Sequence, residues 1–122
     1  GVERTCLVTD ALSYAASDVK PDEGSRIIIE DGVCKLADHS SLAGSIATMD
    51  VLVRTMVQKA NIPLADAVRM ASETPARLMG VSDRTGTLQR GKDADIIILD
   101  RNLTVRAVWS MGNLVLAANT LF

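Results

Sequence analysis

The spacing of the apolar residues changes twice along the chain, and this change limits the possible fold more than any other feature of the sequence. Short β-branched runs occupy residues 4–9, 26–37 and 95–116, whereas the apolar positions of residues 49–79 recur at intervals of three and four. Short apolar runs predict strands, and the longer period predicts amphipathic helices. We therefore expect a mixed α/β chain in which helices separate two groups of strands.

The clearest local signal is the pair Asp31-Gly32 between two β-rich runs. Gly adopts a positive φ at no steric cost, so an Asp-Gly pair in this position favours a tight hairpin. A short strand at residues 4–9 ends at Asp10, and a loop is expected over residues 11–24.

Three helices are predicted between the two groups of strands. The first covers residues 49–60, with Ser45 or Thr48 as its N-cap, and the second follows a proline after a short connection. Thr74 is predicted to cap the third, with the next proline at its first helical position and Gly80 at its end.

Length and charge exclude several classes of protein. The 122 residues suit one domain and are too few for a complete (β/α)8 barrel, which needs ~250. A hydrophobic fraction of 48% excludes a disordered tail, and a formal charge of -2 gives no reason to expect nucleic acid or an anionic membrane as a partner. With no long apolar run and no signal peptide in view, we expect a cytoplasmic protein.

The first residues and the cysteines leave simple alternatives open. The chain begins at Gly1 without a methionine, which fits a processed terminus, a recombinant start or a piece of a longer protein. Cys6 and Cys34 both lie in apolar runs, where buried free thiols are expected rather than a disulfide framework.

Asp10 is the first candidate for chemistry. A carboxylate directly after an apolar strand stands where barrel enzymes present catalytic groups, although a polar loop residue or a helix cap would look the same. The second candidate is the segment 42–49, in which Gly44 next to a helix start lets backbone N–H groups approach a ligand. An ordinary N-cap is the simpler alternative there.

Two other motifs are rejected. The run from Gly86 to Lys92 has the spacing of a phosphate-binding loop, but Asp93 stands where Ser or Thr is needed and a strand follows instead of a helix. Two turn glycines and a solvated lysine explain it better. His39 is the only histidine and lies in a polar stretch, so a metal centre within this chain is not expected, since zinc sites need three or four ligands.

Taken in order, several segments closely resemble the C-terminal third of N-acetylglucosamine-6-phosphate deacetylases, which belong to the amidohydrolase superfamily. The segments are Leu7-Val8-Thr9-Asp10-Ala11, Leu42-Ala43-Gly44-Ser45 with Thr48-Met49, and Ala67-Val68-Arg69-Met70-Ala71-Ser72 with Pro75-Ala76. The run Gly86-Thr87-Leu88-Gln89-Arg90-Gly91-Lys92-Asp93-Ala94-Asp95-Ile96 is shared more widely and points to the superfamily alone. The resemblance extends from about Cys6 to Leu116.

The resemblance implies the fold class: an α/β chain that forms the C-terminal part of a metal-dependent hydrolase (β/α)8 barrel, together with strands of a small β-sandwich. Residues 1–85 would supply the eighth barrel strand, at Thr5–Thr9, and the C-terminal helices of the barrel. Residues 86–122 would supply strands of the sandwich, whose N-terminal partners lie outside this chain.

The resemblance also implies a reaction, the hydrolysis of an acetamide to acetate and a free amine with the help of a divalent ion such as zinc. Asp10 matches the family's catalytic aspartate, which acts first as general base and then as general acid. Ala47, Thr48 and Met49 align with the stretch that contacts the phosphorylated amino sugar. The family's metal ligands and its phosphate-binding Arg and His have no counterparts here, so the isolated chain is expected to hold no metal and to be inactive.

Three alternatives remain open at this point. The substrate of the longer enzyme could be N-acetylgalactosamine 6-phosphate or another amide, or the chain could be a non-catalytic module that binds a sugar or a partner. The runs at residues 6–9 and after Asp95 would expose sheet edges in the isolated chain, which predicts a homo-oligomer.

Overall fold

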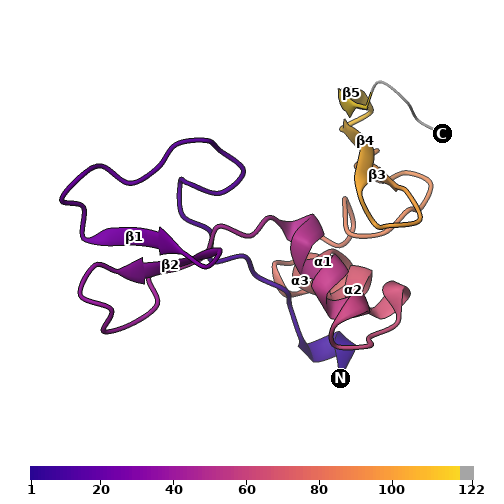
Figure 1. Cartoon of the computed structure of the whole chain (residues 1–122). Coiled ribbons are helices and arrows are strands. Elements are labelled where there is room, and N and C mark those ends of the chain that lie inside the picture. The colour runs from indigo at the N-terminus through magenta and orange to yellow at the C-terminus, as the bar shows by residue number, and fades with distance from the viewer. Residues whose placement is uncertain (119–122) are drawn as a thin grey trace. The chain divides into compact units, whose positions relative to one another are not determined.

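The computed structural model describes residues 1–118, and its elements follow the order expected from the apolar pattern (Figure 1). They are the 3-10 turn η1 (Val2–Arg4), the strands β1 (Ile27–Glu30) and β2 (Val33–Leu36), the helices α1 (Met49–Gln58), α2 (Leu64–Ala71) and α3 (Glu73–Leu78), and the strands β3 (Ile96–Leu99), β4 (Val105–Ser110) and β5 (Asn113–Ala117). The predicted mixture of hairpin, helices and a later group of strands is thereby confirmed.

The chain divides into two compact units. One, here called the hairpin unit, is Val8–Leu52; the other, here called the helical unit, combines Gly1–Leu7 with Val53–Phe122. The boundary expected after residue 85 was predicted between the barrel and the sandwich of a longer enzyme. It does not coincide with the division into these two units, and it stays a prediction.

The hairpin unit contains the antiparallel pair β1–β2. Its turn residues, Asp31 and Gly32, have φ values of 53° and 76°, the left-handed conformations that an Asp-Gly hairpin turn requires. Glu30 pairs with Val33 across this turn, and Ile27 with Leu36 at the other end. The predicted hairpin is confirmed.

The helical unit contains α2, α3, η1 and the three-stranded antiparallel sheet β3–β4–β5. Ala67, Met70 and Ala76 are buried on the helices, and Ala107 is buried on β4. Ala67 and Met70, three residues apart, mark the buried face of α2, whereas Leu64 and Val68, which the apolar spacing also favours as buried, are each 41% exposed.

Two predictions about local structure are wrong. Residues 5–9 form no strand, because among residues 1–118 no neighbouring strand pairs with them; Leu7 donates only one backbone bond, at 2.8 Å, to Met70 of α2. Thr74 does not cap α3, which begins one residue earlier at Glu73. The Thr74 side chain is buried instead, and its hydroxyl donates a 2.9 Å hydrogen bond to the Val2 carbonyl.

Candidate functional site

Asp10, in the hairpin unit, has a left-handed backbone conformation. Its φ is 47°, and its backbone carbonyl accepts a 2.8 Å hydrogen bond from the N–H of Ser45. The Ser45 carbonyl in turn accepts a 2.8 Å bond from Leu12, so that Ala11 and Ser45 form an isolated parallel bridge. These bonds join the two segments that the sequence singled out separately.

Gly44 makes this junction possible. Its φ is 94°, and a Cβ at this position would lie 3.1 Å from the Asp10 carbonyl oxygen and 3.0 Å from Cγ of Leu12. A residue with a side chain would be strained by the backbone conformation and crowded by both neighbours. The glycine is therefore required for the close approach of the two segments, rather than for a helix cap.

The Asp10 side chain is available for chemistry. It is exposed, and within residues 1–118 its carboxylate forms no hydrogen bond or ion pair. A group that moves protons needs such access to water or substrate.

The segment from Ser45 to α1 is ordered by its own side chains. Ser45 Oγ accepts a 2.8 Å bond from the N–H of Ala47, and the Thr48 hydroxyl donates to the carboxylate of Asp50. Thr48 directly precedes α1, its carbonyl accepts a 3.2 Å bond from Leu52, and Met49 begins the helix. Of the two residues predicted as the N-cap of this helix, Thr48 therefore lies directly before the helix, and Ser45 lies three residues further upstream.

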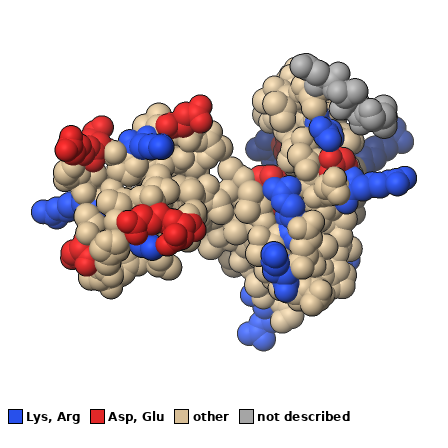
Figure 2. Space-filling view, in the orientation of Figure 1, with Lys and Arg blue, Asp and Glu red and all other residues tan. Residues whose placement is uncertain are grey.

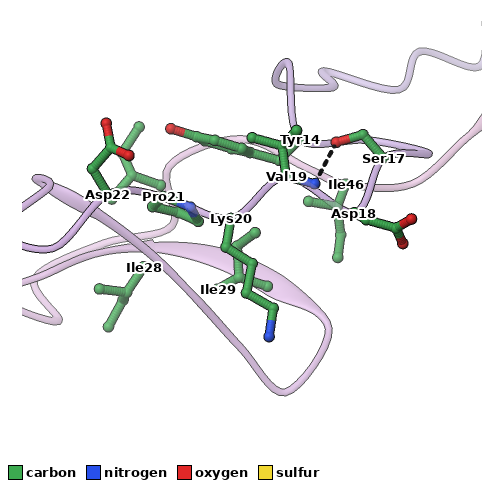
Figure 3. A pocket seen from close by; sticks show the side chains of 11 residues that line it. Tyr14, Ser17, Asp18, Val19, Lys20, Pro21, Asp22, Ile28, Ile29 and Ile46 are labelled. Carbon is green, nitrogen blue, oxygen red and sulfur yellow. Dashed lines mark hydrogen bonds between the residues drawn. The ribbon is translucent and has the colours of Figure 1, made fainter.

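A cavity of about 680 Å³ lies in the same unit, along β1. Figure 3 shows Tyr14 and Val19 on its loop side and Ile28 and Ile29 on its strand side. Ile46, inside the segment singled out by the sequence, also lines it. The sequence analysis missed this cavity, because the loop 11–24 has no periodicity that would predict which of its residues face β1.

His39 lies beside Glu30 in the hairpin unit. Its Nδ1 lies 3.8 Å from a carboxylate oxygen of Glu30, and both side chains are exposed. The hydroxyl and the backbone N–H of Ser40 hold the pKa of the adjacent Asp38 below its ordinary value. Throughout residues 1–118, no three His, Cys, Asp or Glu side chains are grouped so that they could hold a metal ion.

The Gly86–Lys92 run is a structural loop, as expected from its missing Ser or Thr. Lys92 Nζ donates to the Ser82 carbonyl at 2.5 Å and to Thr87 Oγ1 at 2.6 Å. Lys92 therefore stabilises the loop through these two bonds, rather than being the solvated side chain predicted from the sequence. The run leads into β3 and not into a helix.

Comparison with known proteins decides the family. The model of the amidohydrolase family matches residues 7–115, nearly the whole chain. The chain belongs to the amidohydrolase family. Of the residues that the structure describes, none lie in a helix long and apolar enough to cross a bilayer.

Two curated relatives of this amidohydrolase chain are named as deacetylases of phosphorylated amino sugars. An N-acetylgalactosamine-6-phosphate deacetylase of Escherichia coli O157:H7 is 38% identical over 117 residues, covering 92% of this chain and 30% of that protein. An N-acetylglucosamine-6-phosphate deacetylase of Caenorhabditis elegans is 37% identical over 114 residues, covering 92% of this chain and 27% of that protein.

A solved structure agrees with these relatives. The N-acetyl-D-glucosamine-6-phosphate deacetylase of Mycobacterium smegmatis, solved as a mutant in complex with N-acetyl-D-glucosamine-6-phosphate, superimposes with a TM-score of 0.82 at 36% identity. The match covers 96% of this chain and 32% of that one. The amidohydrolase chain thus spans about a third or less of the length of these three proteins.

Proposed function

We propose that the protein carrying this chain hydrolyses the acetamide of N-acetylglucosamine 6-phosphate to glucosamine 6-phosphate and acetate. The observation that carries the proposal is the junction at Ser45, where the backbone carbonyl of Asp10, whose carboxylate is free within residues 1–118, bonds to the segment leading to Ala47, Thr48 and Met49. Relatives and solved structures named as deacetylases of this sugar phosphate support it.

Asp10 is the proton carrier of the proposed reaction. It takes a proton from the water that attacks the acetamide carbonyl carbon, and it delivers a proton to the nitrogen as the C–N bond breaks. A neutral amine leaves far more readily than an amide anion, so the reaction depends on this delivery. Ala47, Thr48 and Met49 contact the sugar and orient the acetamide toward Asp10.

The chain's own residues do not fit a resident metal. Amidohydrolases are generally metal-dependent, but the described part of the chain offers no group of three suitable side chains. We assign the ligands of any zinc or similar ion to residues outside those described.

Phosphate recognition is also assigned outside the hairpin unit. Acidic side chains outnumber basic ones in this unit, whereas basic ones prevail in the helical unit (Figure 2). An acidic surface repels a sugar phosphate, so we expect the cations that bind the phosphate to come from residues outside Val8–Leu52.

The proposal includes the finer architecture. Residues 1–85 complete a (β/α)8 barrel and residues 86–122 contribute to a β-sandwich, of which residues 119–122 lie outside the described part. The likeness to the Mycobacterium smegmatis enzyme supports this assignment. A cytoplasmic, homo-oligomeric enzyme is proposed with it.

Replacing Asp10 tests the function. In the full-length protein, Asp10→Asn is expected to lower kcat for release of glucosamine 6-phosphate by about 10²–10⁴-fold with little change in KM, because the side chain keeps its shape and loses its proton transfer. Asp18→Asn, in the exposed loop of the same unit, is the matched control and should retain activity. An Asp10→Asn enzyme as active as this control would contradict the proposal, as would a wild-type protein without deacetylase activity, which would favour a non-catalytic module.

N-acetylgalactosamine 6-phosphate is the second candidate substrate, because the Escherichia coli O157:H7 relative is named for it. Assays of the full-length protein with both sugars, compared by kcat/KM, distinguish them. A higher value for the galacto sugar would replace the substrate while leaving the role of Asp10 intact.

A further inference from the structure

Ser45 forms hydrogen bonds in two directions, through its backbone and through its side chain. Its N–H donates to the Asp10 carbonyl at 2.8 Å, and its carbonyl accepts a 2.8 Å bond from Leu12. Its Oγ accepts a 2.8 Å bond from the N–H of Ala47. The backbone of Ser45 is thus bonded to the stretch around Asp10, and its hydroxyl to the stretch proposed to contact the sugar.

The bond from Ala47 to the Ser45 hydroxyl closes a short turn of the chain. A Ser side chain that bonds to the backbone two residues ahead takes the place of a backbone hydrogen bond and fixes the chain locally. Ser45 and Ala47 are both half-buried, and a hydrogen bond is stronger where water is partly excluded. The hydroxyl therefore restricts the direction in which the chain leaves Ser45 toward Thr48.

Ile46, the residue inside this turn, has a different environment. Its side chain is half-buried and lines the cavity along β1, together with Tyr14 and Ile29 (Figure 3). Partial burial of an Ile side chain stabilises its position through the hydrophobic effect. The turn is therefore held both by an apolar side chain at the cavity and by the hydroxyl of Ser45.

The residues after the turn have no comparable bond to the stretch around Asp10. Ala47 has no polar side chain, and within residues 1–118 its N–H forms no hydrogen bond other than the one to Ser45. The Thr48 hydroxyl donates to the carboxylate of Asp50, which holds Thr48 relative to α1. The Ser45 hydroxyl is therefore the side-chain group that connects these residues to the junction at Asp10.

We propose that Ser45 is a positioning residue of the deacetylase, whose hydroxyl sets the place of residues 47–49 relative to Asp10. The inference rests on the proposed function and goes beyond it by dividing the junction into two parts. The backbone of Ser45 holds Asp10, and this part remains when only the side chain is shortened. The hydroxyl holds the sugar-contacting stretch, and this part is lost when the oxygen is removed.

Removal of the oxygen alone tests this division. In the full-length protein, Ser45→Ala should raise KM for N-acetylglucosamine 6-phosphate about three- to tenfold, which is the loss expected for one hydrogen bond. The value of kcat should stay within about twofold and keep its pH dependence, because the backbone bonds at Asp10 remain. Asp10→Asn is expected to show the opposite pattern. An unchanged KM in Ser45→Ala, or a kcat with a shifted pH profile, contradicts the proposal.

Two further variants separate positioning from a general loss of structure. Ser45→Thr keeps a hydroxyl on Cβ and should restore KM to within about twofold of the wild type. Ser41→Ala is the matched control, because Ser41 is exposed in the same unit and its hydroxyl forms no hydrogen bond within residues 1–118. Its KM should equal that of the wild type. A Ser45→Thr enzyme as impaired as Ser45→Ala, or an equal effect in Ser41→Ala, overturns the proposal.

Amide hydrogen exchange, followed by NMR without substrate, gives a readout that does not depend on deacetylase activity. The Ala47 amide should exchange at least about threefold faster in Ser45→Ala than in the wild type, because it loses its acceptor. The Leu12 amide, which donates to the Ser45 carbonyl, should exchange equally in both proteins. Equal exchange at Ala47 contradicts the positioning role. A full-length wild-type protein that releases no glucosamine 6-phosphate contradicts the proposed function, and with it the kinetic part of this inference, whatever the exchange rates are.

Discussion

At the scale of single residues, the candidate site depends on a glycine as much as on the aspartate. Asp10 itself has a left-handed φ of 47°, and the neighbouring chain approaches it closely enough for a 2.8 Å bond between Ser45 and the Asp10 carbonyl. A side chain at Gly44 would enter this contact. The geometry of the site therefore makes a direct prediction about stability.

Gly44→Ala is expected to destabilise the chain by more than about 1 kcal/mol, because the new Cβ meets both an unfavourable φ and atoms 3.0–3.2 Å away. Gly32→Ala is the matched control: its φ is also positive, at 76°, but no atom lies within 4 Å of its added Cβ. Urea denaturation should show the larger loss for Gly44→Ala. Equal losses would mean that the contact with Asp10 adds no constraint.

The sequence predicted these residues better than it predicted their arrangement. Asp10 and the segment 42–49 were both selected, and the hydrogen bonds at Ser45 connect them. Ser45 was expected at most as a helix cap, because the sequence shows adjacency only along the chain. The backbone bridge between Ala11 and Ser45 joins residues 34 positions apart, which no local pattern encodes.

At the scale of elements, helices and hairpins were predicted more reliably than caps and isolated strands. Helical periodicity and an Asp-Gly turn are local, so α1 and the β1–β2 hairpin lie where the pattern placed them. Thr74 was misassigned because Thr before Pro resembles an N-cap, whereas its hydroxyl bonds to Val2, far away in sequence. The strand expected at residues 5–9 needs a neighbour that the described residues do not supply.

Thr74→Val tests the tertiary role of this hydroxyl. The substitution keeps the shape and leaves the Val2 carbonyl without its 2.9 Å donor, so a loss of about 1–3 kcal/mol in unfolding free energy is expected. Thr55→Val, at an exposed position of α1, should change stability by less than about 0.5 kcal/mol. A loss at Thr74 no larger than that at Thr55 would show that the bond contributes nothing measurable.

The turn between β3 and β4 is organised by Asp100. The N–H groups of Thr104 and Asn102, together with the guanidinium of Arg106, hold the pKa of this carboxyl below its ordinary value. Because the folded-state pKa is lowered, the ionised carboxylate stabilises the fold above the ordinary value of 3.8, and this contribution is lost as the pH falls through the folded-state pKa.

Asp100→Asn should therefore be less stable than the wild type near neutral pH, with the difference shrinking under acid conditions. Thermal unfolding of both proteins at about pH 7 and well below 3.8 measures this change. Asp83→Asn is a suitable control, because the exposed Asp83 forms no hydrogen bond among the described residues. A difference that stays constant with pH would contradict the role of ionised Asp100.

At the scale of the whole molecule, the described residues supply only part of the groups that the proposed reaction needs. Within residues 1–118, the Asp10 carboxylate next to the junction at Ser45 is free, but no three His, Cys, Asp or Glu side chains are grouped so that they could hold a metal ion. Many apolar side chains on β3 and β5 are also exposed, including Ile97, Leu114 and Val115. Both features agree with a chain that spans about a third of its solved relative from Mycobacterium smegmatis.

The 122-residue chain by itself is therefore expected to release no glucosamine 6-phosphate from the acetylated sugar and to retain no zinc after dialysis. The physical reason is that proton transfer by Asp10 acts on a water and a carbonyl that other groups must hold in place. The measurement is an amine-release assay together with metal analysis, with the full-length protein as the positive control. Activity in the isolated chain that Asp10→Asn abolishes would overturn this expectation and show that the described residues form a complete catalytic site.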